Sequence, residues 1–260
     1  MDGSPMHANC KRFISPLLMA AFTLFGVASA TASSVIVGGT GLLTQSGVDQ
    51  LATWLGEGDL QLTNVFTHSK KDDLKNSVNF HTDADGKGRT FTIAEVKSVG
   101  GVSATIIVGG YNPKSWYTAP DSDIYYNVGA TNNGRTAFLY NLTEGYRLDE
   151  KSYPRINDPG QYQTVNASGY GPGFGGGFDL ITSSNLNSGS AAPSSYEYLP
   201  FSLNPPTTVV GSNQGSVVLT FDKLDVFTIS AVAPLPSTVL MGVALLGGFA
   251  LLQVRRRIDG

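Results

Sequence analysis

Hydrophobic and polar residues alternate with the two-residue period of a half-buried β-strand in several short stretches of this chain. The first clear case is 59–69, where Leu60, Leu62 and Phe66 stand on alternate positions. Similar runs, rich in β-branched and aromatic residues and bounded by Gly, Asn and Pro, predict strands at 89–98, 104–111, 136–142, 177–182, 196–201 and 215–230. The pattern therefore indicates a mainly β protein.

The last of these stretches changes phase in its middle. Val217, Leu219 and Phe221 stand on odd positions, whereas the next alternating pair, Leu224 and Val226, stands on even positions. One extra residue in a strand has this effect, so we expect a β-bulge or bend around Asp222 and Lys223.

Two stretches have helical spacing instead. In 46–58 the apolar residues lie three or four positions apart, at Val48, Leu51, Ala52 and Leu55. We expect Ser46 to cap the start of this helix and Gly56 or Gly58 to end it. In 70–81 the residues expected to share one face of a second helix are Leu74, Val78 and His81.

No stretch alternates strand and helix as a β–α–β unit does. Many short strands with turns between them favour an antiparallel β-sandwich with about two peripheral helices, in the α+β class. The residues 183–215, rich in Ser, Asn, Pro and Gly, are expected to form long surface loops around one short strand.

The N-terminal residues have the pattern of a secretory signal peptide. Lys11 and Arg12 precede an uncharged run, 13–30, which closes with small residues at Ala28 and Ala30. A positive start, an apolar middle and an A-x-A end predict cleavage by signal peptidase after Ala30. The alternative is a membrane anchor that is never cut.

The C-terminal residues predict a second membrane segment. Residues 238–254 carry no charge, and Arg255, Arg256 and Arg257 follow them directly. An uncharged run of 17 residues lies near the lower limit for a transmembrane helix, and the arginines are expected to stay on the cytoplasmic side. The body of the protein, 31–237, is therefore expected outside the cytoplasm.

Composition excludes two kinds of chemistry. The chain has 17 Lys and Arg against 20 Asp and Glu, and no basic patch appears in its body, so nucleic acid is not an expected partner. The only cysteine, Cys10, precedes the predicted cleavage site. The mature protein would therefore have neither disulfides nor thiol chemistry.

Three motifs resemble functional sites but lack required residues. The run 35–43, "VIVGGTGLL", is typical of a dinucleotide-binding turn or of the start of a trypsin-like protease, yet no helix begins at its glycines and no Gly-Asp-Ser-Gly follows. The run 83–88, "DADGKG", begins like a calcium loop, but Ala94 stands where the bidentate glutamate is needed, so a tight turn is expected. His68 and His81 lack zinc-motif spacing, so we expect histidines with structural partners.

Asn141 and Asn166 each begin a glycosylation sequon, which we interpret as accidental. We expect no cofactor, no metal and no catalytic residue.

The stretch 170–180, "YGPGFGGGFDL", contains five glycines, namely Gly171, Gly173, Gly175, Gly176 and Gly177. A phosphate-binding loop needs a lysine and a Ser or Thr after its glycines, and here Phe178 and Asp179 follow. We therefore expect glycines that make room for neighbouring main chain, while the aromatic residues beside them become buried.

Five blocks in order resemble the TLDc domain. These are residues 65–97, "IVGGYNPKSW" at 107–116, "TAFLYNL" at 136–142, "YGPGFGGGFDL" at 170–180 and "FDKLDVFTI" at 221–229. The resemblance implies a β-sandwich with flanking helices over 42–230, preceded by a lead-in, 31–41. Eukaryotic members are linked to protection against oxidative stress and several bind the V-ATPase, but the resemblance supplies no catalytic residue.

The residues 231–260 resemble the PEP-CTERM sorting signal of Gram-negative bacteria. Pro234, Leu235, Pro236 and Ser237 precede the apolar run and the three arginines, with Leu235 where glutamate is commonest. The resemblance implies processing by an exosortase. The alternative is an ordinary C-terminal anchor.

Together these features predict an exported protein, anchored in the inner membrane and then displayed on the cell surface or in the matrix. We expect a non-enzymatic module that associates with exopolysaccharide or other surface proteins. The alternatives are a secreted enzyme that acts on glycans through carboxylates such as Asp121, Asp123 or Asp179, and indirect protection against oxidative stress.

Overall fold

The structure is a computed structural model that describes residues 33–71, 74–119, 124–127, 131–153, 157–198, 207–213 and 215–232. Contacts divide the chain into Met1–Thr31 and Ala32–Gly260, and every described residue belongs to the second unit. The signal peptide, the sorting motif, the helix predicted at 238–254 and the carboxylates Asp121 and Asp123 lie outside the described residues.

Within these ranges the chain is mainly β, as predicted. The strands are β1 (Val35–Val37), β2 (Leu60–Ser69), β3 (Thr90–Val99), β4 (Val102–Asn112), β5 (Tyr125–Asn127), β6 (Phe138–Asn141), β7 (Tyr146–Glu150), β8 (Tyr162–Val165), β9 (Gly173–Phe174), β10 (Leu180–Thr182), β11 (Ser188–Ala191), β12 (Tyr196–Tyr198) and β13 (Val217–Ala231). The helices are α1 (Gln45–Leu55), α2 (Ser77–Ala84) and the 3-10 turn η1 (Pro159–Gln161).

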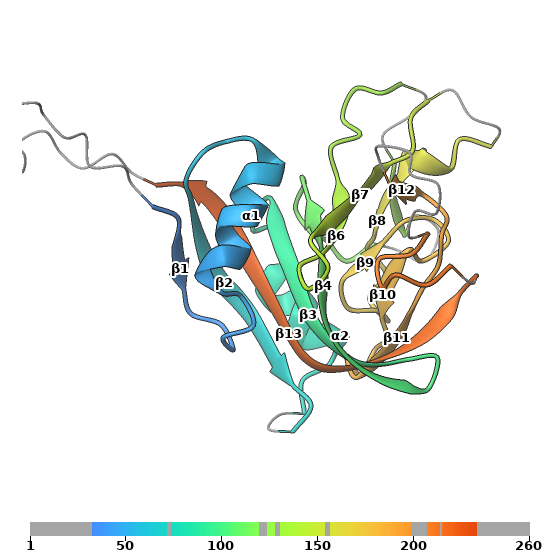
Figure 1. Cartoon of the computed structure of the whole chain (residues 1–260), viewed down its shortest axis with the longest axis horizontal. Helices are drawn as coiled ribbons and strands as arrows, with labels where there is room; N and C mark the ends of the chain where they lie inside the picture. Colours follow the sequence, from blue (N-terminus) through green and yellow to red (C-terminus); the bar gives the residue numbers. More distant parts are fainter. Residues whose placement is uncertain are drawn as a thin grey trace, which may run out of the picture. The chain divides into compact units, whose positions relative to one another are not determined.

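All thirteen strands belong to one hydrogen-bonded sheet with the order β12-β7-β6-β4-β3-β13-β11-β10-β9-β8-β5, and β2 and β1 branch from β13 (Figure 1). The first part of β13 pairs with β11 and the second part with β2, while β3 runs beside both. The long strand β13 therefore joins the two parts of the sheet.

Among the strands that the structure describes, every pair is antiparallel except one. β1 lies parallel to β2, with Ile36 opposite Leu62, and α1 connects the two strands. The expectation that no β–α–β unit occurs was therefore wrong. The sequence signal for β1 was weak, because a strand of three residues is too short to show a period-two pattern.

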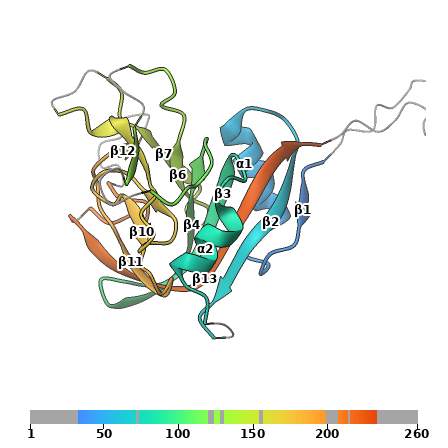
Figure 2. The same ribbon diagram turned by 180° about the vertical axis from the view of Figure 1, so that it is seen from behind.

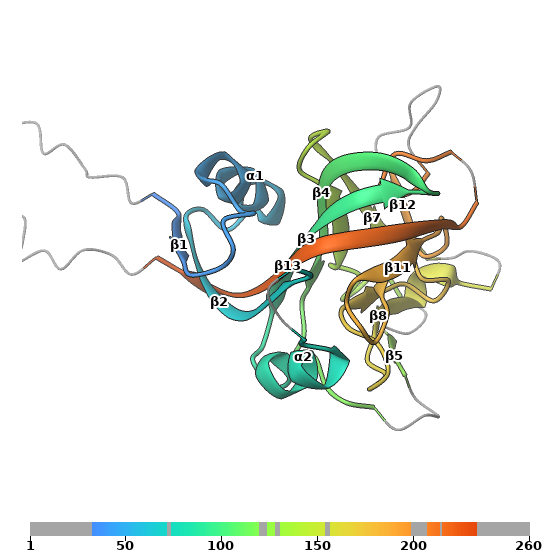
Figure 3. The ribbon, with the colours of Figure 1, turned by 90° about the horizontal axis from the view of Figure 1, so that it is seen from below.

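The two helices cover opposite faces of the β2–β13–β3 part of the sheet, as the views from the front, from behind and from below show (Figures 1, 2 and 3). On β3, Phe91 and Ile93 belong to the core beneath α1, whereas Ala94 and Val96 belong to the core beneath α2. The alternation of one strand thus supplies both cores.

The larger core lies between the two parts of the sheet. The ring of Phe174 on β9 contacts Gly110 on β4, where an added Cβ would come within 2.5 Å of the ring. The same ring meets Trp116 edge to face at 5.5 Å. The sheet therefore closes on itself around this core in a sandwich-like manner.

Bulges change the phase of the alternation in the central strands. The pairing of β13 with β3 skips Asp222, which confirms the predicted irregularity. The pairing of β13 with β2 skips Val65, so Leu62 faces the core under α1 while Phe66 faces the other core. The expectation that both share one face was wrong because the bulge shifts the alternation by one residue.

The helix starts differ from prediction. Thr44, rather than Ser46, caps α1, because its hydroxyl oxygen accepts a hydrogen bond from the Gly47 N–H. Gly56 ends α1 with φ +75°, as predicted.

The second helix begins at Ser77 behind a capping box formed by Asn76 and Asn79. Leu74 is therefore outside the helix and 99% exposed, and Val78 is also exposed. The buried face of α2 carries Phe80 and His81, so the predicted face was right for His81 and wrong for Leu74 and Val78.

The predicted loop region contains the expected strand β12 but also β11, which pairs with β13. No helix among the described residues is long and apolar enough to span a membrane. Val35 of β1, Gln61 of β2 and Ser230 of β13 occupy neighbouring positions, so both ends of the described unit leave the same end of the sheet (Figure 1).

Candidate functional site: a polar groove beside the end of α1

The glycine-rich turn is filled by the protein's own side chains. At each of the five glycines an added Cβ would come closer than 3 Å to a side chain of another residue. The contacts are Gly171 with Leu186 (2.3 Å), Gly173 with Val165 (2.9 Å), Gly175 with Asp179 (2.0 Å), Gly176 with Tyr162 (2.6 Å) and Gly177 with Ser194 (2.4 Å). The glycines thus make room for side chains, not for neighbouring main chain as the sequence suggested. Among the five, only Gly175 also has a positive φ, of +79°.

Asp179 organises this turn. Its buried carboxylate accepts hydrogen bonds from the backbone N–H groups of Ser194, Ser195 and Tyr196 at 2.8–3.0 Å. Burial raises the pKa of Asp179 to about 6, against the three N–H donors, which lower it. The carboxylate is 2% exposed, so Asp179 holds two segments together and is not placed to meet a glycan.

The hydrogen-bond donors of the other glycine-rich run, 35–43, also bond to groups of the protein itself. Thr40 donates both its backbone N–H and its hydroxyl to Asp225 Oδ2, at 2.8 and 2.7 Å. Thr67 donates to Asp225 Oδ1 at 2.9 Å. A carboxylate of β13 therefore occupies the donors that a nucleotide phosphate would need.

Both predicted structural histidines have partners. His81 Nδ1 lies 2.8 Å from Asp85 Oδ1 and its Nε2 lies 3.3 Å from the Ala167 carbonyl oxygen, which ties α2 to the segment after β8. His68 Nε2 lies 3.0 Å from Asn187 Oδ1. Among the residues placed in the structure, no group of three or more His, Cys, Asp or Glu could hold a metal ion.

Both sequon asparagines are fully buried in the fold. Asn141 donates to the Val209 carbonyl oxygen at 3.1 Å, and Asn166 donates to the Thr164 hydroxyl at 3.2 Å. Neither side chain is accessible for glycosylation in the folded protein.

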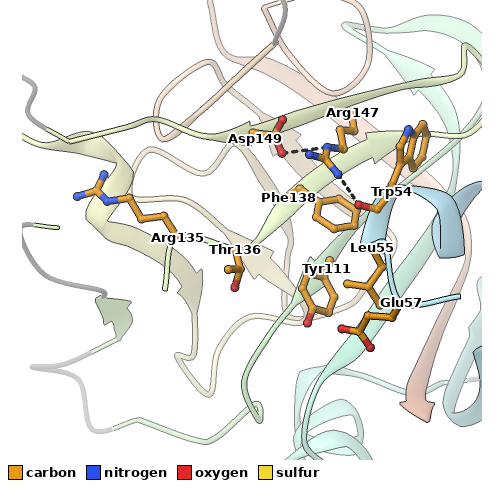
Figure 4. A pocket seen from close by; sticks show the side chains of 9 residues that line it. All are labelled: Trp54, Leu55, Glu57, Tyr111, Arg135, Thr136, Phe138, Arg147 and Asp149. Carbon is orange, nitrogen blue, oxygen red and sulfur yellow. Dashed lines mark hydrogen bonds and ion pairs between the residues drawn. The ribbon is translucent and has the colours of Figure 1, made fainter. Parts of the chain in front are cut away.

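A groove of about 390 Å³ lies beside the C-terminal end of α1 (Figure 4). Its lining residues come from α1 and the turn after it, from the end of β4, and from β6, β7 and the segment before β6. They are Trp54, Leu55, Glu57, Tyr111, Arg135, Thr136, Phe138, Arg147 and Asp149. This volume is typical of small-molecule sites.

Arg147 connects two walls of this groove. Its Nε lies 2.9 Å from Asp149 Oδ1, and its Nη1 donates to the carbonyl oxygen of Trp54 (Figure 4). Its guanidinium also lies over the ring of Phe138, 5.1 Å from the centroid. A cation at the last turn of a helix is favourable, because the helix dipole is negative there.

Glu57 stands on the opposite wall and has a cation of its own. Arg89 Nη1 lies 2.5 Å from Glu57 Oε1, and this hydrogen bond raises the pKa of Arg89. Burial raises the pKa of the neighbouring Tyr111 hydroxyl. Tyr111 and Phe138, with ring centroids 5.1 Å apart, form an aromatic floor between the two walls.

Arg135 lines the groove but points away from the other side chains (Figure 4). Its Nη2 lies 2.6 Å from both oxygens of Asp158, and its Nη1 donates to the Lys151 carbonyl oxygen. Arg135 therefore fastens the chain around η1 to β7.

Glu150 lies on the other face of β7, at 5% exposure. Its Oε2 accepts from the Ala137 N–H and from Gln163 Nε2, whereas Glu150 Oε1 and Gln163 Oε1 are buried without a hydrogen-bond donor. Burial raises the pKa of Glu150 to about 9, so the carboxyl is protonated at neutral pH.

Sequence reasoning did not find this groove. Trp54 and Glu57 lie within or just after a predicted helix, but Arg147 and Asp149 lie on β7, a strand that was missed. The alternation of Tyr146 and Leu148 with Arg147 and Asp149 is the signal that could have found that strand.

No protein-family model matches the chain, and no curated protein matches it either.

Proposed function

We propose that this protein is an exported, surface- or matrix-associated TLDc-domain protein that acts as a non-catalytic binding module. Signal peptidase cuts after Ala30, and the helix 238–254 anchors the chain in the inner membrane with its body in the periplasm. An exosortase then recognises the motif 234–237, and the module reaches the cell surface or matrix. There it binds exopolysaccharide through the groove beside α1.

The mainly β fold supports the TLDc assignment, because the resemblance implies strands in a sandwich with flanking helices. The closure of the sheet around the Phe174 core supports the finer assignment as a β-sandwich. The exit of both ends from neighbouring strands suits a module that carries a signal at each terminus.

The groove is the observation that carries the binding function. It combines aromatic rings with polar groups of both charges, and protein sites for small polar ligands have this composition. Its charged side chains are held in place by Arg147 and Arg89, so a ligand would meet an ordered surface.

Glycan hydrolysis is the second candidate, because the groove holds two carboxylates, Glu57 and Asp149. A glycosidase needs one carboxyl group that carries a proton, whereas each of these forms an ion pair with an arginine. Binding is therefore favoured. If the protein released reducing sugar from a bound polysaccharide and Glu57→Gln abolished this release, hydrolysis would be favoured over binding alone.

Protection against oxidative stress, which the resemblance also suggests, would have to be indirect. The only cysteine, Cys10, precedes the proposed cleavage site, so the mature protein offers no thiol to a peroxide.

Two experiments test the proposal. The full-length chain, purified in detergent, is passed over immobilised exopolysaccharide, whole cells and a panel of neutral and acidic glycans, and retention on at least one of them is expected. Absence of retention on all of them would refute the binding function. Separately, Pro236→Ala is expected to stop C-terminal processing and surface delivery, and unchanged delivery would refute recognition by an exosortase.

A further inference from the structure

The charged side chains that face the groove occur in pairs of opposite sign. Arg147 is bonded to Asp149 on one wall, and Arg89 is bonded to Glu57 on the other. Arg135, the remaining cation of the lining, is turned toward Asp158 and is neutralised there. The groove therefore presents no net charge to a ligand.

Each carboxylate still has a free acceptor atom. Within the part of the chain that the structure describes, Asp149 Oδ2 and Glu57 Oε2 accept no hydrogen bond, and both residues are partly exposed. The arginine on the first oxygen of each group fixes the direction of the second. Thr136, which is exposed and lines the groove, adds a hydroxyl donor.

The apolar part of the groove lies between these polar groups. Tyr111 and Phe138 lie beneath the groove and are only 5% and 3% exposed, so the apolar surface open to a ligand is that of half-buried Trp54 and Leu55 on the α1 wall (Figure 4). A ligand that fits must place donors toward two fixed carboxylates and an apolar surface toward this wall. A sugar ring has hydroxyls at its edge and C–H groups on its faces.

From this arrangement we propose that the groove binds a neutral oligosaccharide or a neutral segment of a polysaccharide. The hydroxyls of the sugar donate to Asp149 and Glu57, and its C–H face lies against Trp54 and Leu55 of the α1 wall. A uronate or phosphate ligand would approach two carboxylates, and a cationic ligand would approach the guanidinium of Arg147, so both are disfavoured. This inference rests on the proposed glycan-binding function and specifies its ligand class.

The test is isothermal titration calorimetry of the full-length chain in detergent with neutral gluco- and xylo-oligosaccharides and with oligogalacturonate as the acidic probe. Asp149→Asn and Glu57→Gln keep the shape of the side chain and an oxygen for the arginine, but they remove one charged acceptor. Glu144→Gln, on the exposed turn between β6 and β7, is the matched control.

The neutral ligand is expected to bind the parent protein. Its Kd is expected to rise about tenfold or more in either groove variant, because a hydrogen bond to a charged group contributes about 1.5–3 kcal/mol. Its Kd is expected to stay unchanged in the control. Any residual binding of oligogalacturonate is expected to strengthen in the same variants, because a repulsive charge is removed.

Binding of the acidic probe alone would overturn the neutral-ligand inference while leaving the glycan-binding function intact. Neutral binding that both groove variants leave unchanged would place the site elsewhere and overturn the inference in the same way. No binding of any oligosaccharide or of exopolysaccharide would refute both. Equal unfolding midpoints for the variants and the parent show that the differences in Kd come from the site.

Discussion

Replacement of Glu150 by Gln is expected to stabilise the protein, and by more at higher pH. The carboxyl is buried, its pKa is raised from 4.5 to about 9, and one of its oxygens has no donor. Folding therefore favours the protonated form. The contribution of Glu150 to stability is fully present below pH 4.5 and is lost as the pH rises toward about 9.

The size of the effect follows from a single proton. Between these two pKa values the unfolded chain loses the Glu150 proton while the folded protein keeps it, which costs about 1.4 kcal/mol of unfolding free energy per pH unit. From pH 5.5 to 7.5 the parent protein is expected to lose about 3 kcal/mol through this residue. Glutamine does not titrate, and its amide NH₂ supplies a donor at the position of the unpaired Oε1.

Urea unfolding followed by tryptophan fluorescence measures this difference, because Trp116 is fully buried and reports loss of the core. The quantity of interest is the unfolding free energy of Glu150→Gln minus that of the parent, at pH 5.5, 6.5 and 7.5. Titrations of other groups, including Asp179, occur in both proteins and cancel. A difference that stays constant over this range would show that Glu150 has no raised pKa and would refute the reasoning.

Three further substitutions test the packing of the glycine-rich turn. Gly176→Ala is expected to destabilise the protein by about 1–3 kcal/mol, because the new Cβ would come within 2.6 Å of the Tyr162 ring. Gly169→Ala is the control. No atom lies within 4 Å of a Cβ at that position, so the urea midpoint is expected to stay nearly unchanged. Asp179→Asn is expected to cost about 2–4 kcal/mol, because an amide NH₂ would face a backbone N–H in place of a carboxylate oxygen, and an unchanged thermal midpoint would contradict this role. Phe174→Ala is expected to cost about 3–5 kcal/mol by calorimetry, and a loss below about 1 kcal/mol would show that its ring does not fill the core between the two parts of the sheet.

The central strands could be predicted because alternate side chains in them lie on opposite faces of the sheet, which produces a period-two pattern of apolar residues in the sequence. β2, β3, β4 and β13 are long enough to show it. β11, with the sequence Ser-Gly-Ser-Ala, has no such pattern and is a strand only because β10 and β13 pair with it on either side. Short strands of this kind are set by tertiary contacts that no local window contains.

The face of α2 was mispredicted for a related reason. Leu74 and Val78 have the correct spacing for one helix face, but the capping box at Asn76 starts the helix after Leu74. The bulge at Val65 likewise reverses the phase of β2 at one residue that has no special composition. The groove could not be predicted because its side chains come from α1, β4, β6 and β7, which only the order of strands in the sheet brings together.

The two glycine-rich runs that resemble phosphate loops share one physical property in the folded protein. In each run, donors that could face an anion instead face an oxygen of the chain itself: Thr40 donates to Asp225, and the Gly176 N–H donates to the Ser195 hydroxyl. The carboxylate of Asp179, beside the second run, accepts hydrogen bonds from the three backbone N–H groups of 194–196. A phosphate would have to displace an internal carboxylate or hydroxyl and leave it buried without its donor, which costs about 1–3 kcal/mol or more for each group. Glycine here allows one part of the chain to bind another closely, and the groove beside α1, where carboxylate oxygens remain unbonded, is the better place to seek an external ligand.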